Sequence, residues 1–370
     1  MFLTASNLVH YLVARKLLRT SDVVDGHFSV VEAGQHNRNF KVRIGDKRGF
    51  FIKQIPTVEN LARSSNLKEA FSYQCASEIP QWNRWMLNLV DFDQARHCLV
   101  LELYVDSQNL REFYYARDEF PDEVASMLGS ALADLHTLKI EGSVIDESQS
   151  QFARSVPWIF TYHQKSLFKP GSISGGQVAF GDVVSQRSNL AMHLDRVAGG
   201  WRTEMLMHGD IKWDNCLILK YVETEEGQSS ARYALKLIDW EMIDIGDASW
   251  DVGAVFQAYL SHWIMRKYKD SRASRDQLLA LTFEKLPSVF SSILSFWNSY
   301  SSARQMKSEY KKTYLLRCLE FGAVRMLQTA FESLYHSSEM TAHAYALLDL
   351  SERILCNPEM AASELLGLSE

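Results

Sequence analysis

The spacing of hydrophobic positions near the N-terminus changes from helical to strand-like. A first helix, capped by Thr4 or Ser6, is predicted from residues that recur at helical intervals, namely Leu8, Val9, Leu12, Val13 and Leu17. Between positions 28 and 54 the pattern shortens into three hydrophobic runs, 28–32, 39–44 and 49–53, with turns around Gly34 and Gly45 between them. This pattern predicts three antiparallel strands in a meander.

Further along the chain, helical spacing dominates. A helix is predicted over 66–77, followed by short hydrophobic runs at 85–90 and 98–104, the second of which is typical of a buried strand. Pro121 marks the first position of another helix, because its missing N–H costs nothing there. Helical patterns return over 252–268, 278–297 and 310–335. We therefore predict an α+β protein with a boundary near residue 105, which separates domains 1–105 and 106–370.

Residues 141–200 have the least regular pattern of the chain. A run rich in Pro, Gly and Ser at 170–176 interrupts them and indicates a turn. We interpret 141–200 as a loop, an insertion or a lid.

Composition and charge exclude several classes of protein. The chain is 46% hydrophobic and 23% charged, as globular proteins are, and its formal net charge of −6 argues against a nucleic-acid partner, which needs a concentrated basic surface. Charged and polar residues interrupt positions 1–20, so neither a signal peptide nor a membrane span is expected. The five cysteines form no CxxC pair, which predicts a reducing, cytoplasmic setting without a disulfide framework or a zinc site.

Two short segments, 206–218 and 237–251, concentrate polar side chains that suit catalysis. A hairpin is predicted from the runs 216–221 and 233–238 around a polar turn at 223–230, and it would place Asp239 beside Asn215. A general base requires a carboxylate on a rigid loop, which Asp210 can supply, and a divalent metal prefers the oxygen ligands that Asn215 and Asp239 offer.

The spacing of these residues resembles a known family. His208-Gly-Asp210-xxxx-Asn215 and Ile238-Asp239-Trp-Glu241-xxxx-Gly246-Asp247-xxx-Asp251 are similar to the paired signatures of the aminoglycoside phosphotransferase and choline kinase family. The resemblance implies a two-lobed protein-kinase-like fold, with a small antiparallel β-sheet in the N-lobe and a larger, mainly helical C-lobe. It also implies ATP or GTP, Mg²⁺, and phosphoryl transfer to a hydroxyl of a small molecule or of a peptide Ser or Thr side chain.

The resemblance assigns expected roles to the second half of the site. Asp210 corresponds to the catalytic base, Asn215 and Asp239 correspond to the metal ligands, and His208 and Asp251 correspond to structural positions. Lys212 stands where protein Ser/Thr kinases keep a lysine that contacts the transferred phosphate, and the alternative is an exposed loop lysine.

The resemblance also assigns roles in the first half of the chain. Lys53 corresponds to the lysine that binds the nucleotide phosphates, with Glu69, 16 positions later, or else Glu78 as its ion-pair partner. Gly34 and Asn37 lie in the segment that corresponds to the phosphate-covering loop. Glu102 and Tyr104 flank the predicted hinge that receives the nucleotide base. His136 ends a helix that also resembles the family, and we expect it to pack or cap.

The acceptor is not fixed by these motifs. Acidic residues outnumber basic ones between 106 and 150, which would favour a cationic acceptor, although such runs are usually solvated surfaces. Aromatic residues at helical spacing suit either an acceptor pocket or helix packing: Trp263, Phe296, Trp297, Tyr314 and Phe321. Two other functions stay open, a nucleotide-binding pseudokinase or scaffold without activity and a nucleotidyl transferase on the same fold.

Overall fold

The computed structural model describes residues 2–26, 28–33, 38–46, 48–54, 60–117, 119–146, 152–164, 173–225, 228–267 and 287–368. The chain forms two compact units, and each is built from three separate segments. Unit 1 comprises Met1–Arg117, Glu141–Gln151 and Asp214–Ile243, and unit 2 comprises Asp118–Ile140, Phe152–Trp213 and Asp244–Glu370. The α+β class with a small antiparallel sheet is confirmed, while the division into 1–105 and 106–370 stays a prediction.

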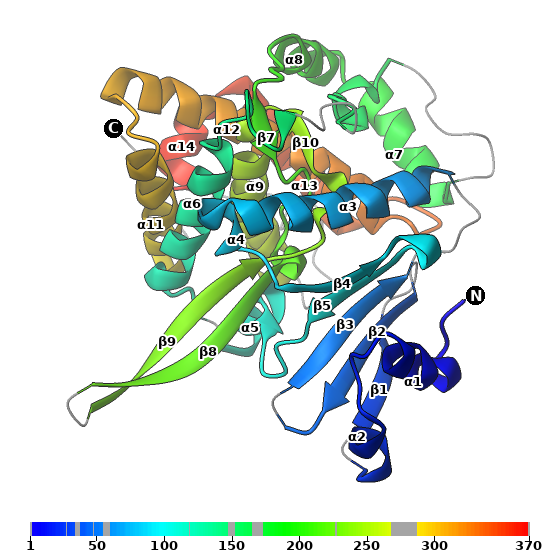
Figure 1. The fold of residues 1–370 in the computed structure, drawn as a ribbon. Coiled ribbons are helices and arrows are strands. Elements are labelled where there is room, and N and C mark those ends of the chain that lie inside the picture. Colours follow the sequence, from blue (N-terminus) through cyan, green and yellow to red (C-terminus); the bar gives the residue numbers. More distant parts are fainter. Residues whose placement is uncertain are drawn as a thin grey trace. The chain divides into compact units, whose positions relative to one another are not determined.

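A five-stranded antiparallel sheet with the order β1-β2-β3-β5-β4 forms the core of unit 1 (Figure 1). Its strands are β1 (Phe28–Ala33), β2 (Arg38–Ile44), β3 (Arg48–Gln54), β4 (Leu89–Asp93) and β5 (Cys98–Glu102). Successive side chains of β2 point to opposite faces of the sheet, as they do in any β-strand. Phe40, Val42 and Ile44 are buried in a hydrophobic cluster with the first helix, whereas the residues between them line a pocket. The predicted meander of three strands is confirmed.

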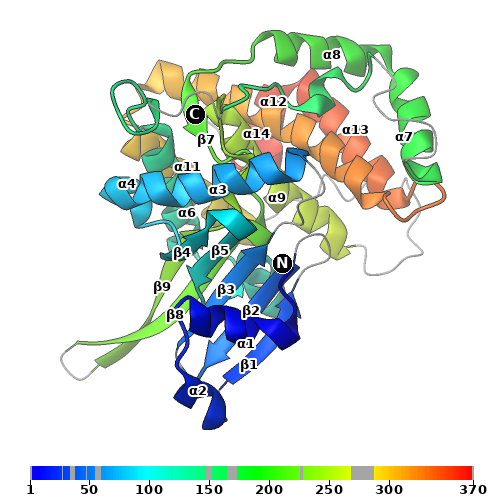
Figure 2. The same cartoon turned by 45° about the vertical axis from the view of Figure 1, so that its right-hand side comes forward.

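The first helix, α1 (Ala5–Ala14), covers the hydrophobic face of this sheet (Figure 2). Thr4 caps it, as one of the two predicted residues: its hydroxyl accepts a hydrogen bond from the Asn7 N–H, and the Asn7 side chain accepts one from the Thr4 N–H. Leu8 and Leu12 are fully buried, while Val13 on the same predicted stripe is exposed. The buried face of α1 is therefore narrower than the sequence pattern predicts.

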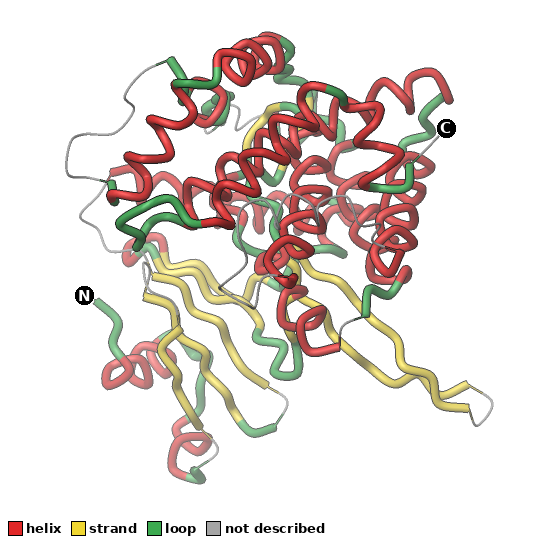
Figure 3. Tube along the Cα trace, turned by 180° about the vertical axis from the view of Figure 1, so that it is seen from behind, coloured by secondary structure: helices red, strands yellow, loops and turns green. Residues whose placement is uncertain are grey.

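A second sheet in unit 1 contains a long hairpin. Its strands are β6 (Gln108–Asn109), β8 (Cys216–Glu225) and β9 (Gln228–Leu237), which are drawn in yellow like the other strands in Figure 3. The hairpin is confirmed, but the predicted turn at 223–230 is too long. The ladder continues to the pair Glu225 and Gln228.

The remaining elements of unit 1 are mostly helical and flank the two sheets. They are α2 (Thr20–Val24), α3 (Asn60–Glu78), α4 (Pro80–Asn83), η1 (Gln94–Arg96), α5 (Leu110–Arg117) and η5 (Trp240–Met242). The short turn η4 (Trp213–Asn215) joins the segments of the two units along the chain.

Unit 2 is mainly helical. Its helices are α6 (Asp122–His136), α7 (Gly175–Ser185), α8 (Ser188–Gly199), α9 (Ala248–Lys267), α11 (Pro287–Ala303), α12 (Ser308–Ser333), α13 (Ala342–Cys356) and α14 (Pro358–Leu365). A short turn, η3 (Trp158–Thr161), and the antiparallel strands β7 (Met205–Met207) and β10 (Asp244–Gly246) complete it. Helices α12 and α13 lie side by side (Figure 2). Among the described residues, no helix combines the length and the hydrophobicity that a membrane crossing needs.

Two predictions about the helical part of the chain need correction. Pro121 is the N-cap residue of α6 and not its first helical residue. The segment 141–200 is not simply a loop, because α7 and α8 lie within it; 147–151 and 165–172 are outside the described residues. Helix α11 is described over Pro287–Ala303, and the predicted start of this helix at 278 stays a prediction because it lies outside the described residues.

Candidate active site

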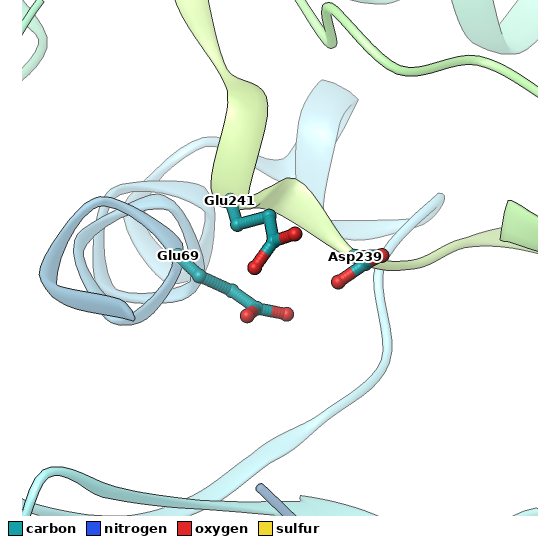
Figure 4. Close-up of side chains that lie close together, drawn as sticks. All are labelled: Glu69, Asp239 and Glu241. Atoms are coloured by element: carbon teal, nitrogen blue, oxygen red, sulfur yellow. The ribbon is translucent and has the colours of Figure 1, made fainter. Parts of the chain in front are cut away.

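Lys53, near the end of β3, lies at the centre of an ion cluster in unit 1. Its Nζ atom is 2.6 Å from Glu69 Oε2, 2.5 Å from Asp239 Oδ1 and 3.5 Å from Glu241 Oε2. The side chains of Lys53 and Glu69 are buried, with exposed fractions of 5% and 2%. Figure 4 shows the three carboxylates, which come from α3 and from the segment after β9, pointing toward one another. Of the two predicted partners of Lys53, Glu69 is confirmed and Glu78 is not.

The backbone around Asp239 explains how two carboxylates reach this cluster. Asp239 has φ 66° and ψ 57°, a left-handed conformation that Asp adopts more readily than most residues. The chain turns there directly after β9 and enters η5. The left-handed turn thus brings both Asp239 and Glu241 to the ammonium of Lys53.

The cluster keeps Lys53 charged. Burial alone would lower the pKa of Lys53, but the negative charges of Glu69, Asp239 and Glu241 outweigh it and raise this pKa above the ordinary value for lysine. Lys53 is consequently a buried cation, and burial raises the pKa of its partner Glu69, although the charge of Lys53 opposes that shift. The partly exposed Asp239 and Glu241 add negative charge that a second cation can neutralise.

A cavity of about 570 Å³ lies against this cluster within unit 1. Its volume is in the range of small-molecule and cofactor sites. Lys53, Glu69, Glu102, Tyr104 and Asn215 line it, together with Asp239 and residues from β2 and β3. The structure therefore brings six of the predicted site residues to one cavity. Gly34 and Asn37 are outside the described residues.

The hairpin fixes Asn215 beside Asp239. Cys216 pairs with Leu237 at the open end of the ladder, and the Ile238 N–H donates a hydrogen bond of 3.0 Å to the Asn215 carbonyl. This pairing places Ile238 and Asp239, which follow β9, next to Asn215, which precedes β8. Asn215 and Asp239 thus both line the cavity, as the predicted hairpin requires.

Asp210 lies in unit 2, in a loop that Asp251 supports. The buried carboxylate of Asp251 accepts hydrogen bonds from the His208 N–H (2.7 Å) and the Gly209 N–H (3.0 Å). Gly209 has φ 83°, where a side chain would be strained. Asp210 Oδ2 accepts a hydrogen bond of 2.6 Å from Lys212 Nζ. The structure therefore places Lys212 against Asp210, and its predicted contact with a phosphate stays a prediction.

His136 also supports this loop. Its Nε2–H donates to Asp251 Oδ2 at 3.2 Å, because the carboxylate can only accept, and its Nδ1 then accepts from the Tyr300 hydroxyl at 3.0 Å. Burial lowers the pKa of His136 below its ordinary value, although the Asp251 carboxylate opposes this shift. Burial alone would raise the pKa of Asp251, but the His136 hydrogen bond and neighbouring donors lower it. His136 is a neutral packing and hydrogen-bonding residue, as expected.

This arrangement predicts a pH dependence of stability. The unfolded chain takes up a proton on His136 near its ordinary pKa of 6.5, whereas the folded protein does so only at lower pH. The free energy of unfolding should therefore fall as the pH drops through about 6.5. His136→Asn removes this titration, so the variant should lose less of its free energy of unfolding between neutral and mildly acidic pH than the wild type. Urea unfolding at a series of pH values measures both losses, and equal losses would contradict the assignment.

The aromatic residues considered for an acceptor pocket are buried among helices. Phe296, Trp297, Tyr314 and Phe321 are at most 5% exposed, and their rings contact other aromatic rings within unit 2. Trp263 is 7% exposed. Their burial fits the packing alternative.

Two site residues were not predicted. Glu241 is visible in the motif that contains Asp239, but no role was assigned to it from the sequence. Arg325 lies 114 positions after Ile211, whose carbonyl it contacts, and no local pattern marks it. Only the spacing of acidic residues in the motif could have indicated Glu241.

Comparisons with known proteins show the family of the chain. A model of a family described as the phosphotransferase enzyme family matches residues 27–275, and because this is more than half of the chain, the chain belongs to this family. It is a phosphotransferase that acts on an alcohol group. None of the curated protein sequences compared with the chain matches it.

Several solved structures are similar to the chain. A choline kinase from Cryptosporidium parvum has 12% sequence identity and a TM-score of 0.52, over 99% of this chain and 98% of that one. A macrolide 2′-phosphotransferase from Brachybacterium faecium has 11% identity and a TM-score of 0.49, over 93% and 97%. A choline/ethanolamine kinase family protein from Mesorhizobium loti has 15% identity and a TM-score of 0.48, over 96% and 97%. The first of these similarities confirms the protein-kinase-like fold.

Proposed function

We propose that the protein is a kinase that transfers the γ-phosphate of ATP, with Mg²⁺, to a hydroxyl group of a small molecule. The observation that carries the proposal is the buried ion cluster of Lys53, Glu69 and Asp239 at the wall of a cavity large enough for a nucleotide. GTP remains an alternative nucleotide, and a Ser or Thr side chain of a peptide remains an alternative acceptor.

In this proposal Lys53 binds the nucleotide phosphates, and Glu69 holds it in place. A lysine with one buried carboxylate partner on α3 keeps a fixed position, because leaving Glu69 unpaired in the interior would be costly. Phosphoryl transfer depends mainly on positioning and on neutralising negative charge. A fixed cation at the cavity wall serves both needs. Glu102 and Tyr104 line the same cavity and flank the segment proposed to receive the base.

The side chains present suit a magnesium ion. Asn215 and Asp239 offer the oxygen ligands that Mg²⁺ prefers, and carboxylate oxygens of Glu69, Asp239 and Glu241 all lie within 4.8 Å of one another. We propose Asn215 and Asp239 as the residues that would hold the ion. When bound, Mg²⁺ supplies charge neutralisation at the phosphates.

Asp210 is the proposed base, which orients the acceptor hydroxyl and takes its proton. Its oxygen Oδ2 contacts the ammonium of Lys212, whose side chain is 44% exposed. An exposed ion pair contributes little to stability, so Lys212 can exchange this contact for a phosphate oxygen at small cost. Lys212 is therefore proposed to contact the transferred phosphate.

A small-molecule acceptor is favoured by the names of similar proteins, which include choline kinases and a macrolide phosphotransferase. These names describe those proteins and not this chain. We therefore propose the acceptor only as a class, a molecule with an accessible hydroxyl group.

A mass-spectrometric assay tests the proposal. The protein is incubated with Mg²⁺, ATP or GTP, and a panel of choline-like amines, aminoglycosides, macrolides, sugars and Ser- or Thr-containing peptides. A gain of one phosphate on an acceptor, absent with Asp210→Ala, supports the kinase. Nucleotide binding without a mass gain on any acceptor would indicate a pseudokinase or scaffold. A gain of a nucleoside monophosphate would indicate a nucleotidyl transferase.

A further inference from the structure

Arg325, in the middle of α12, contacts the loop that carries Asp210, and both belong to unit 2. Its Nη2 atom donates a hydrogen bond of 3.1 Å to the carbonyl of Ile211, the residue directly after Asp210. The same atom is 3.7 Å from Asp210 Oδ1. One guanidinium group thus contacts both the backbone and the carboxylate at this point of the loop.

Trp250 holds the other side of the loop and orients Arg325. The indole Nε1–H of Trp250 donates a hydrogen bond of 3.0 Å to the carbonyl of Gly209, the residue before Asp210. The guanidinium carbon of Arg325 lies 4.9 Å from the centre of the Trp250 ring, which is a favourable stacking distance for arginine. The carbonyls on both sides of Asp210 therefore accept hydrogen bonds from two side chains that stack on each other.

Two ion pairs of Asp210, with Lys212 and with Arg325, differ in exposure. The side chain of Arg325 is 8% exposed and faces Oδ1, whereas that of Lys212 is 44% exposed and contacts Oδ2. A buried, hydrogen-bonded and stacked cation is costly to displace, while an exposed ion pair is easily exchanged. The two oxygens of this carboxylate consequently have unequal partners, one fixed and one exchangeable.

We infer that Arg325 is a positioning residue for phosphoryl transfer, which fixes the orientation of Asp210 through Oδ1 and Ile211 so that Oδ2 is the oxygen presented to the acceptor hydroxyl. This inference rests on the proposed role of Asp210 as the base. Helix α12, which is far from the motifs in the sequence, then helps to arrange the loop that carries Asp210. Arg325 touches neither the acceptor nor the nucleotide in this role.

Arg317 provides a matched control on the same helix. Its guanidinium carbon lies 4.8 Å from the centre of the Phe321 ring, and its Nη2 atom donates to the Gly200 carbonyl and contacts the Asp247 carboxylate. Arg317 therefore has the same chemistry as Arg325, with an aromatic ring, a carbonyl and a carboxylate, but its partners lie outside residues 208–212. Loss of either arginine should lower stability, and only loss of Arg325 should disturb the orientation of Asp210.

The test compares Arg325→Met with Arg317→Met. With Arg325→Met, kcat should fall by about 100-fold while KM for the nucleotide stays unchanged, because misplacing a catalytic group costs about this factor. Arg317→Met should keep kcat close to that of the wild type.

Arg325→Lys should recover only part of kcat, because an ammonium lacks the planar fork of donors. Added guanidinium should raise kcat of Arg325→Ala and should leave that of Arg317→Ala unchanged. A wild-type kcat in Arg325→Met, or equal losses in the two Met variants, would overturn the inference.

Hydrogen exchange provides a second measurement that does not depend on activity. The amides of residues 208–213 should exchange faster in Arg325→Met than in the wild type and in Arg317→Met. Unchanged exchange in Arg325→Met would overturn the inference even if the wild type were an active kinase. Faster exchange in Arg325→Met, together with a wild-type protein that transfers no phosphate, would instead support the contact and refute the proposed function.

Discussion

Asp210→Asn should lower kcat by roughly 1,000-fold, within the range that general-base catalysis contributes, and leave nucleotide affinity close to that of the wild type. Asn has nearly the same shape as Asp but cannot take the proton of an acceptor hydroxyl. The Asp210 side chain is not among those that line the described cavity, so the proposed contacts to the nucleotide remain. Steady-state kinetics with a saturating acceptor and fluorescence titration with a nucleotide measure the two effects separately.

Asp195→Asn is a suitable control for this experiment. Asp195 is also in unit 2, and its carboxylate interacts with His163 Nε2 at 3.0 Å and with the Gln164 side chain at 2.7 Å. The same loss of charge at this exposed carboxylate should leave kcat unchanged. Nearly wild-type kcat in Asp210→Asn would remove Asp210 from the mechanism, and an equal loss in both variants would indicate an effect of net charge.

Local patterns in the sequence predicted much of unit 1. In β2 the alternation of Phe40, Val42 and Ile44 with polar residues indicated a strand with one buried face, and the hydrophobic cluster confirms it. The pairing of Lys53 with Glu69, 16 positions later, was implied by the family resemblance, and the ion pair confirms it. Likewise, the hairpin placed Asn215 beside Asp239, because ladder pairing follows directly from the order of residues in two neighbouring strands.

Features that depend on contacts between distant segments could not be predicted. The start of α7 shows why: Ser174 and Gln177 form a capping box, but Gly175 and Gly176 next to them indicated a turn. These glycines are needed because a Cβ atom at either position would lie 2.4 Å or 2.7 Å from backbone carbonyls of Ser338 and Glu339. No property of residues 170–176 reveals such a neighbour. Arg325 is a similar case, since its role depends on the packing of α12 against Trp250 and the loop at 208–211.

The ion cluster around Lys53 leads to the second large effect that we expect. Asp239→Asn should weaken nucleotide binding in the presence of Mg²⁺ by at least about 100-fold. Mutating a residue that only supports a metal ligand already lowers metal affinity by about 10- to 100-fold, and Asp239 is itself a proposed ligand. It should also lower kcat. The buried pair of Lys53 with Glu69 persists in this variant, so the proposed phosphate contact of Lys53 is retained. Titration with ATP, once with Mg²⁺ and once with EDTA, measures the change.

The comparison between Mg²⁺ and EDTA separates metal binding from a general loss of the site. Without Mg²⁺, Asp239→Asn should bind the nucleotide as well as the wild type or better, because one negative charge near the phosphates has been removed. Glu112→Gln is the control, since Glu112 lines the same cavity but accepts its hydrogen bond from the Asn109 N–H instead of joining the ion cluster. Equal weakening of Asp239→Asn with and without Mg²⁺ would mean that Asp239 supports the cavity through Lys53 and not through a metal. If Asp239→Asn weakens nucleotide binding only in the presence of Mg²⁺, the carboxylates of the cluster bind the ion that accompanies the nucleotide.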